Sequence, residues 1–224
     1  MKVILALLIA AALGYLMGSL NFSIIVVKLL KGRDIRTVGS RNAGLTNTYR
    51  CFGPQCAALT LLGDLLKGIV AVLLSQLFAG MLKVGFAPDN EVKYIGFIAG
   101  FFAILGHVFP LYYGFKGGKG VLVGVASFLP IEPRVFFTLL IIFIVIFAIT
   151  KYVSVSSIMG ALSAPVAIFF MSLIVDGVGF GRSLLYMLLC IPMTAMVVYM
   201  HRSNIERYME GTESKFTFKF NKDR

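Results

Sequence analysis

Long apolar runs separated by short polar links extend along most of the chain. The runs cover residues 3–27, 56–80, 92–113, 119–131, 134–150, 153–175 and 183–200. A helix needs about 20 apolar residues to cross the hydrocarbon core of a bilayer, and most of these runs approach or exceed that length. The pattern predicts an all-α integral membrane protein with about seven transmembrane helices in a single domain spanning residues 1–224.

The fourth and fifth runs are short, and Pro130 and Pro133 stand between them. They can cross the bilayer as two short helices or form one broken hairpin, so five crossing helices is the competing count. Both counts are odd. The two largest basic segments, 28–55 and 201–224, therefore fall on the same side of the membrane.

Lysine and arginine are unevenly distributed between the links. With seven spans and the N-terminus outside, the inner segments are 28–55, 114–119, 151–152 and 201–224, and they hold 15 of the 21 basic residues. Cytoplasmic loops carry such an excess, so we expect a cytoplasmic C-terminus. Ala10 to Ala12 imitate a signal-peptide cleavage site, but the apolar run continues to Val27, which favours an uncleaved first span.

Composition narrows the class of protein further. Hydrophobic residues make up 58% of the chain, charged residues 14%, and the mean hydropathy is +0.90, which excludes a soluble globular domain. The net charge of +11 sits in short links, so anionic lipid headgroups and a phosphate-bearing substrate are the expected partners rather than nucleic acid. Three cysteines without a C-x-x-C pair favour small buried side chains over a disulfide framework or a zinc site.

The first of three polar clusters covers residues 39–50. It combines hydroxyl, carboxamide and guanidinium groups with two glycines that allow a close approach of the backbone to a ligand. Its candidate ligand residues are Ser40, Asn42, Thr46, Asn47 and Arg50. A plain polar loop beside lipid headgroups explains the composition equally well.

The second cluster covers residues 106–120 and ends in Lys116-Gly117-Gly118-Lys119-Gly120 before an apolar run. Free backbone N–H groups at a helix start favour phosphate, so we expect an anion site here. The spacing is one residue short of a nucleotide-binding P-loop and lacks its hydroxyl residue. His107 is a possible base, although a packed or capping histidine is the commoner role.

The third cluster covers residues 201–215, directly after the last run. His201 and Asn204 are three residues apart and share a helix face. A solvated basic tail explains the arginines of this cluster but not His201. His201 and Glu206 imitate the H-x-x-x-x-D box of another acyltransferase class, but five helical residues turn about 140°, which separates the pair.

Two smaller features remain. Asp64 and Lys67 lie three residues apart inside the second run, where charges are costly; a functional and a mutually paired structural role are equally open. Ser154 and Ser157 follow the predicted inner link 151–152 and add hydroxyl groups near the three clusters.

Taken together, the three clusters resemble the bacterial acyl-phosphate:glycerol-3-phosphate acyltransferase family (PlsY). The similarity rests on Gly39 to Arg50, on Gly106 to Gly120 and on His201 to Lys215, in order and on one predicted side. It covers essentially the whole chain. Ala43 and Tyr208 depart from residues common in the family, without loss of a functional group.

The resemblance implies an enzyme of the bacterial inner membrane that moves an acyl group from acyl phosphate to the 1-hydroxyl of glycerol-3-phosphate. The products are lysophosphatidate and inorganic phosphate, an early step of phospholipid synthesis. Carried over by position, the expected catalytic residues are Ser40, Arg50, Lys119, His201 and Asn204. The expected substrate or phosphate ligands are Asn42, Thr46, Asn47, Lys116, Gly117, Gly118, Gly120, Ser154, Ser157 and Glu206.

Residue chemistry favours direct attack of the glycerol hydroxyl on the acyl phosphate, with neither a metal nor a cofactor. Membrane lipids are expected partners, and a monomer is expected, although the sequence does not determine the oligomeric state. Either His201 or a substrate phosphate oxygen accepts the proton. The main alternative is a transporter of an organic phosphate, which would place polar residues at the bilayer midplane. A purely structural membrane subunit leaves the polar clusters unexplained.

Overall fold

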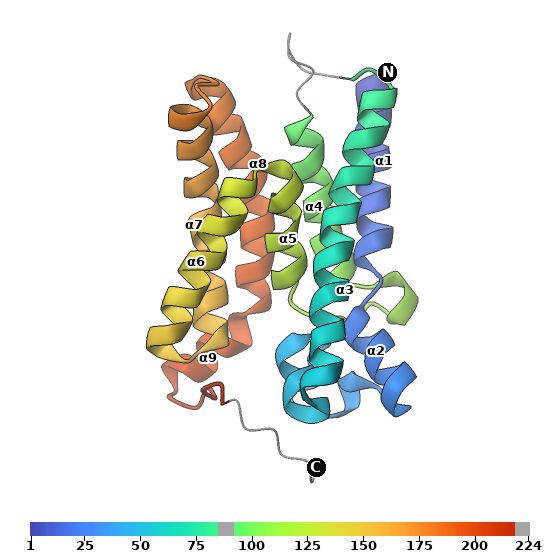
Figure 1. Ribbon diagram of the computed structural model, residues 1–224, viewed down its shortest axis with the longest axis vertical. Helices are drawn as coiled ribbons and strands as arrows, with labels where there is room; N and C mark the ends of the chain where they lie inside the picture. The colour runs from blue at the N-terminus through green and yellow to red at the C-terminus, as the bar shows by residue number, and fades with distance from the viewer. Residues whose placement is uncertain (85–91, 218–224) are drawn as a thin grey trace.

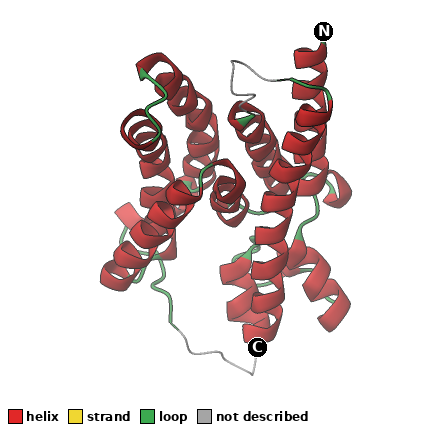
Figure 2. Cartoon of the chain, turned by 45° about the horizontal axis from the view of Figure 1, so that its top comes forward, coloured by secondary structure: helices red, strands yellow, loops and turns green. Residues whose placement is uncertain are grey.

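The computed structural model describes residues 1–84 and 92–217, which are helices and their connecting loops (Figure 1, Figure 2). The long helices are α1 (Lys2–Gly18), α3 (Leu45–Met81), α4 (Lys93–Val108), α6 (Pro133–Thr150), α7 (Val153–Phe170) and α8 (Phe180–Met200). The shorter elements are α2 (Phe22–Lys31), η1 (Ile35–Thr37), η2 (Leu111–Tyr113), α5 (Val121–Ile131), η3 (Met171–Val175, a π-turn) and α9 (Arg202–Met209). Residues 218–224 of the predicted basic tail lie outside this description.

Each of the seven predicted runs is helical in the structure. Within the described residues, six segments are long and apolar enough to cross a membrane: Lys2–Lys31, Leu45–Met81, Lys93–Tyr113, Pro133–Thr150, Val153–Val175 and Phe180–Met200. The remaining run, α5, has 11 residues. At 1.5 Å per residue it is about 16 Å long, roughly half of a hydrocarbon core about 30 Å thick. The count of seven crossing helices therefore stays a prediction.

The first predicted run, 3–27, is not one straight helix. α1 ends at Gly18, and Asn21 begins α2 by accepting the N–H of Ile24 at 3.2 Å with its side-chain oxygen. Asparagine is a strong helix N-cap, so Asn21 in the middle of the run was the signal for this break. The freed carbonyl of Leu20 accepts a hydrogen bond from Lys67 of α3 at 2.8 Å.

The second predicted run begins too late at residue 56, because α3 starts at Leu45 and includes much of the first polar cluster. Gly53 interrupts this helix with φ 83° just before Pro54. Glycine tolerates that backbone conformation, and proline removes the hydrogen-bonding N–H of the following turn. The kink separates a short polar segment, 45–52, from the long apolar part of α3.

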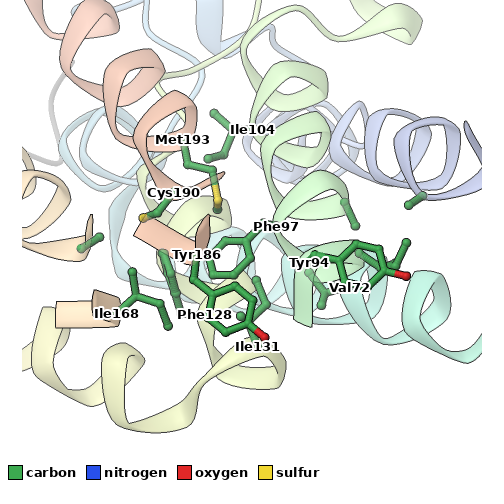
Figure 3. Close-up of a cluster of buried hydrophobic side chains, with 14 of the residues drawn as sticks. Val72, Tyr94, Phe97, Ile104, Phe128, Ile131, Ile168, Tyr186, Cys190 and Met193 are labelled. Atoms are coloured by element: carbon green, nitrogen blue, oxygen red, sulfur yellow. The ribbon is translucent and has the colours of Figure 1, made fainter. Parts of the chain in front are cut away.

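The helices form two groups that meet at α5 (Figure 1). α1, α3 and α4 pack together with α2 at one side, and α6, α7 and α8 form the second group. α5 packs against α3, α4 and α6 and thus joins the groups. The buried core between them contains the stacked rings of Phe97 and Tyr186, with Phe128 at the edge of Phe97 (Figure 3).

An ion-pair network fixes the far end of α5, away from the polar clusters. Lys93 at the start of α4 contacts Glu132 at 2.9 Å and Asp176 at 3.1 Å, and Arg134 pairs with the same two carboxylates. Glu132 lies between α5 and α6, and Asp176 follows η3. The network anchors the C-terminal end of α5 and leaves its N-terminal end recessed within the bundle.

Candidate active site

A cavity of about 670 Å³ lies at the N-terminal end of α5, and all three polar clusters contribute to its lining. The glycine-containing loop 114–120, which leads into the short helix α5, supplies Gly117, Gly118, Lys119 and Gly120 to the lining. In Figure 1 this end of the bundle, where α2, α9 and the start of α3 lie, is opposite the N-terminus.

The loop 114–120 is held by its own backbone and by a distant arginine. The N–H groups of Gly117 and Gly118 donate to the carbonyls of Val108 and His107 at 3.0 and 3.1 Å. Arg36, held by Asp34, donates to the carbonyl of Tyr113 at 2.5 Å. These contacts aim the N-terminus of α5 into the cavity, where its partial positive charge favours an anion.

Gly118 is packed so tightly that no side chain fits there. A Cβ atom at this position would overlap the backbone oxygen of Ala43 and Nε2 of His107. A backbone oxygen cannot rotate away as a flexible side chain can. The glycine at 118 therefore brings the loop 114–120 directly against the first cluster.

In the first cluster, Asn47 holds the loop before α3 in place. Its side-chain nitrogen donates to the carbonyls of Val38 and Asn42 at 3.1 Å, and its oxygen accepts the N–H of Ser40 at 3.0 Å. The side chain is buried and fully engaged. Asn47 lines the cavity, as do the predicted ligands Ser40, Asn42, Thr46 and Arg50, but its own contacts make it a support for Ser40.

The break between α8 and α9 places His201 at the cavity wall. Its side chain is buried, and Nδ1 lies 2.7 Å from the carbonyl oxygen of Val197. A carbonyl only accepts, so Nδ1 carries the proton and Nε2 is left as an acceptor. Burial lowers the pKa of His201 to about 4, and the charge of Lys119 lowers it too, while the contact with Val197 opposes the shift. His201 is therefore neutral at neutral pH.

Glu213 joins three elements around the cavity and was missing from the predicted site. Its Oε1 accepts hydrogen bonds from Ser154 of α7 and Asn204 of α9, both at 2.7 Å, and its Oε2 accepts Arg207 at 2.8 Å. Burial alone would raise the pKa of Glu213, but the hydrogen bonds from Asn204, Ser154 and Arg207 hold it below the ordinary value. The carboxylate is thus ionised.

Lys119 reaches the same network from the glycine-containing loop. Its ammonium donates to Oδ1 of Asn204, whose Nδ2 in turn donates to Glu213. Burial lowers the pKa of Lys119 to about 8, helped by the nearby charge of Arg207 and opposed by Glu213. Lys119 is a cation at neutral pH. Asn204 holds its ammonium in place, and Asn204 rather than Lys119 contacts the carboxylate of Glu213.

Beneath the loop 114–120, Asp64, Lys67 and His107 form a buried polar group. Lys67 Nζ lies 2.7 Å from Oδ1 of Asp64 and 2.9 Å from Nδ1 of His107. Both the carboxylate and the histidine line the cavity. The structure thus shows Asp64 and Lys67 paired with each other inside the membrane segment. Lys67 also contacts His107, which lines the cavity.

All but two of the predicted site residues line the cavity. Lys116 is exposed, and only its carbonyl has a described contact, with Arg36 at 3.2 Å. Glu206 is also exposed, because it lies about 200° around α9 from Asn204. Besides Asp64 and His107, the polar lining residues absent from the predicted site are Arg41, Arg202, Ser203, Arg207, Glu213 and Ser214. Glu213 is one of three glutamates at positions 206, 210 and 213, so its charge alone did not distinguish it in the sequence.

The charge balance of the cavity suits an anionic ligand. Its basic residues are Arg41, Arg50, Lys119, Arg202 and Arg207, and its acidic residues are Asp64 and Glu213. Both acids are paired, with Lys67 and Arg207 respectively. Cationic side chains, the start of α5 and a neutral histidine thus converge on one cavity beside the apolar side chains of Leu122, Phe143 and Met200.

Comparison with known proteins gives a consistent result. Residues 8–211 match the family model described as glycerol-3-phosphate acyltransferase. Proteins named glycerol-3-phosphate acyltransferase from Clostridioides difficile (strain 630) and Syntrophomonas wolfei are 38% and 39% identical, over 95% and 92% of this chain and 96% and 94% of theirs.

Two solved structures are similar to the whole fold. One is the glycerol 3-phosphate form of PlsY, an integral membrane glycerol 3-phosphate acyltransferase, with a TM-score of 0.78 and 31% identity over 94% of this chain and 96% of that one. The other is its lysophosphatidic acid form, with a TM-score of 0.75 and 28% identity over 95% and 96% of the two chains.

Proposed function

This chain belongs to the glycerol-3-phosphate acyltransferase family, as its sequence predicted, and we propose that it transfers a fatty acyl group from an acyl phosphate to the 1-hydroxyl of glycerol-3-phosphate. It is an integral membrane acyltransferase with several apolar helices. The observation that carries the proposal is the single cavity in which Lys119, Arg50 and the start of α5 meet beside a neutral His201. Both proposed substrates carry phosphate, and both must enter this space together.

The proposed reaction needs no covalent acyl-enzyme, because phosphate is already a good leaving group. The 1-hydroxyl oxygen attacks the acyl carbonyl carbon, the bond from that carbon to the phosphate oxygen breaks, and inorganic phosphate leaves. Lys119, Arg50 and the N–H groups at the start of α5 stabilise the charge on the phosphate groups. Ser40 and Asn204 position the acceptor.

The hydroxyl proton goes to Nε2 of His201 in this proposal. Nδ1 is committed to Val197, and among the described residues Nε2 makes no hydrogen bond. A neutral imidazole with a free Nε2 is a competent proton acceptor. The acyl tail follows the apolar wall formed by Leu122, Phe143 and Met200 toward the lipid.

The proposed location is the bacterial cytoplasmic membrane, with the cavity open to the cytoplasm. The basic residues concentrate at the cavity end, which supports this orientation under the positive-inside rule. A cytoplasmic opening also suits a water-soluble acceptor, while the donor and product remain in the lipid. Lysophosphatidate is the proposed product, and a monomer suffices for the reaction because one chain supplies the cavity.

Purified protein in lipid tests the proposal directly. Palmitoyl phosphate and glycerol-3-phosphate are supplied together, and release of inorganic phosphate and formation of lysophosphatidate are followed, with palmitoyl-CoA as a parallel donor. Phosphate release that requires both substrates supports the proposal. Turnover with the CoA donor alone keeps the acyltransferase and overturns the donor. Folded protein without turnover on either donor overturns the reaction and favours transport of an organic phosphate.

A further inference from the structure

His107 stands apart from the mechanism, yet its ring borders the cavity. The side chain is only 4% exposed and comes from the end of α4, directly before the loop 114–120. Its two ring nitrogens have different surroundings. Nδ1 contacts Lys67, whereas Nε2 has no hydrogen-bond partner among the described residues.

Lys67 determines which nitrogen of His107 carries the proton. An ammonium group has three N–H donors and no acceptor. The ammonium contacts the carbonyl of Leu20 at 2.8 Å and Nδ1 of His107 at 2.9 Å within hydrogen-bond geometry, and it forms an ion pair with Oδ1 of Asp64 at 2.7 Å. Nδ1 therefore accepts a hydrogen bond. Asp64 lies 3.7 Å from Nδ1, too far to take a proton from it in a hydrogen bond.

A neutral imidazole that accepts at Nδ1 must donate at Nε2. Nε2 lies so close to Gly118 that a Cβ atom there would overlap it, and both residues border the cavity. A buried N–H group without a partner costs free energy unless a ligand accepts from it. Gly118 belongs to the same loop that presents Lys119 and the start of α5 to the cavity.

We propose that Nε2–H of His107 donates a hydrogen bond to a phosphate oxygen in the cavity, and that Lys67 and Asp64 fix the tautomer that makes this donation possible. His107 is then a binding residue, and Lys67 and Asp64 are positioning residues. The inference rests on the proposed function for the nature of the ligand. The ligand chemistry is a phosphate group, from either glycerol-3-phosphate or the acyl phosphate.

Two isosteric variants separate this role from plain packing. His107→Asn keeps an acceptor near Nδ1 for Lys67 but removes the donor at Nε2. His107→Gln keeps a donor near Nε2 but removes the acceptor for Lys67. Loss of one hydrogen bond to a charged group weakens binding by about tenfold or more, so we expect that loss for the Asn variant and partial rescue in the Gln variant.

Steady-state kinetics show which of the two substrates carries the phosphate group that His107 binds. If His107 binds glycerol-3-phosphate, the Asn variant raises the KM of that substrate about tenfold, with kcat nearly unchanged. If it binds the phosphate of the donor, the KM of acyl phosphate and the inhibition constant of inorganic phosphate rise instead. Ser75→Ala is the control, since Ser75 is buried on the same helix as Lys67 and bonds only its own helix, to Ala71. Wild-type kinetics in the Asn variant, with a destabilised Gln variant, overturn the proposal in favour of packing.

A binding measurement keeps the test independent of turnover and of variant folding. The chain has only two histidines, so ¹⁵N-histidine NMR of the wild type, assigned with His201→Asn, reports the tautomer of His107. The proposal is supported if the proton is on Nε2 and if the Nε2 signal shifts on titration with inorganic phosphate or glycerol-3-phosphate. A proton on Nδ1, or no shift at saturating phosphate, overturns it. Phosphate binding without acyl transfer would instead disprove the proposed function alone.

Discussion

Asn204 donates a hydrogen bond from Nδ2 to Oε1 of Glu213 at 2.7 Å while its Oδ1 accepts one from Lys119. The amide is therefore held in one orientation, with its donor toward the acid and its acceptor toward the ammonium. Through Asn204, the carboxylate of Glu213 therefore fixes the position of the Lys119 ammonium. Ser154 supplies a second donor to the same oxygen, so α7 belongs to this arrangement too.

Removing the charge of Glu213 should weaken this arrangement. In Glu213→Gln, one side-chain oxygen is replaced by an NH₂ group, so either Arg207 or both Asn204 and Ser154 lose their acceptor. We expect kcat/KM to fall by about tenfold to a hundredfold, the range for one or two lost charge-assisted bonds. Glu210→Gln is the matched control, because Glu210 is exposed and outside the cavity lining. Equal activity in both variants would contradict the role of Glu213.

The pH dependence of activity should report Lys119. A lysine is charged below its pKa, and the pKa of Lys119 is lowered to about 8 by burial and by Arg207. Anion binding, measured by kcat/KM, should therefore hold below about pH 8 and decline above it. Lys119→Arg keeps its charge to much higher pH, so we expect the alkaline decline to move upward by at least about one pH unit. An unmoved decline in that variant would assign it to another group.

His201 should act on turnover rather than on affinity. Its pKa of about 4 keeps the ring neutral, and Nδ1 is held by Val197. His201→Asn retains a donor for Val197 but loses Nε2, whereas His201→Gln loses the donor for Val197 and places near Nε2 a carboxamide, which is not a base. We expect kcat to fall by about 10²–10⁴ in each variant, with KM for glycerol-3-phosphate nearly unchanged. The acid side of the wild-type pH profile should fall near pH 4. A variant that loses only affinity would leave a substrate phosphate as the proton acceptor.

Much of the site was predictable because its residues cluster along the chain. The three polar clusters interrupt apolar runs, and all three line the cavity. The hydrogen bonds within each cluster could not be predicted from the sequence. Asn47, for example, was predicted as a ligand because of its side-chain chemistry, but its amide is taken up by the loop 38–42. Spacing cannot show whether a carboxamide faces a ligand or its own backbone.

Hydropathy predicted the helices but not their interruptions. The run 3–27 is uniformly apolar in a hydropathy window, and yet Asn21 begins a new helix within it. The break provides the carbonyl of Leu20 that Lys67 needs, and Lys67 is distant in sequence from both Leu20 and His107. Such a contact depends on how α1, α3 and α4 pack, which no local pattern records.

The packing of Gly118 leads to a paired prediction. In Gly118→Ala the new Cβ would overlap the backbone oxygen of Ala43, so the loop 114–120 must move. We expect affinity for glycerol-3-phosphate to fall at least about tenfold, because a displaced loop misplaces Lys119. Gly181→Ala in the exposed start of α8 meets nothing within 4 Å and should raise stability by about 0.4–1 kcal/mol. Thermal unfolding and binding by calorimetry measure both effects, and normal binding in Gly118→Ala would contradict the tight fit.

The buried pair of Lys67 and Asp64 should show strong coupling in stability. Each side chain is about 1% exposed, and they lie 2.7 Å apart. Lys67→Met leaves the buried carboxylate of Asp64 without its cation, which costs about 3–5 kcal/mol of unfolding free energy. Asp64→Asn in the same background removes the unpaired charge and should recover part of that loss. Unfolding midpoints of the wild type, both single variants and the double variant give the coupling energy. Additive losses would mean that the two charges are solvated independently, in conflict with their burial.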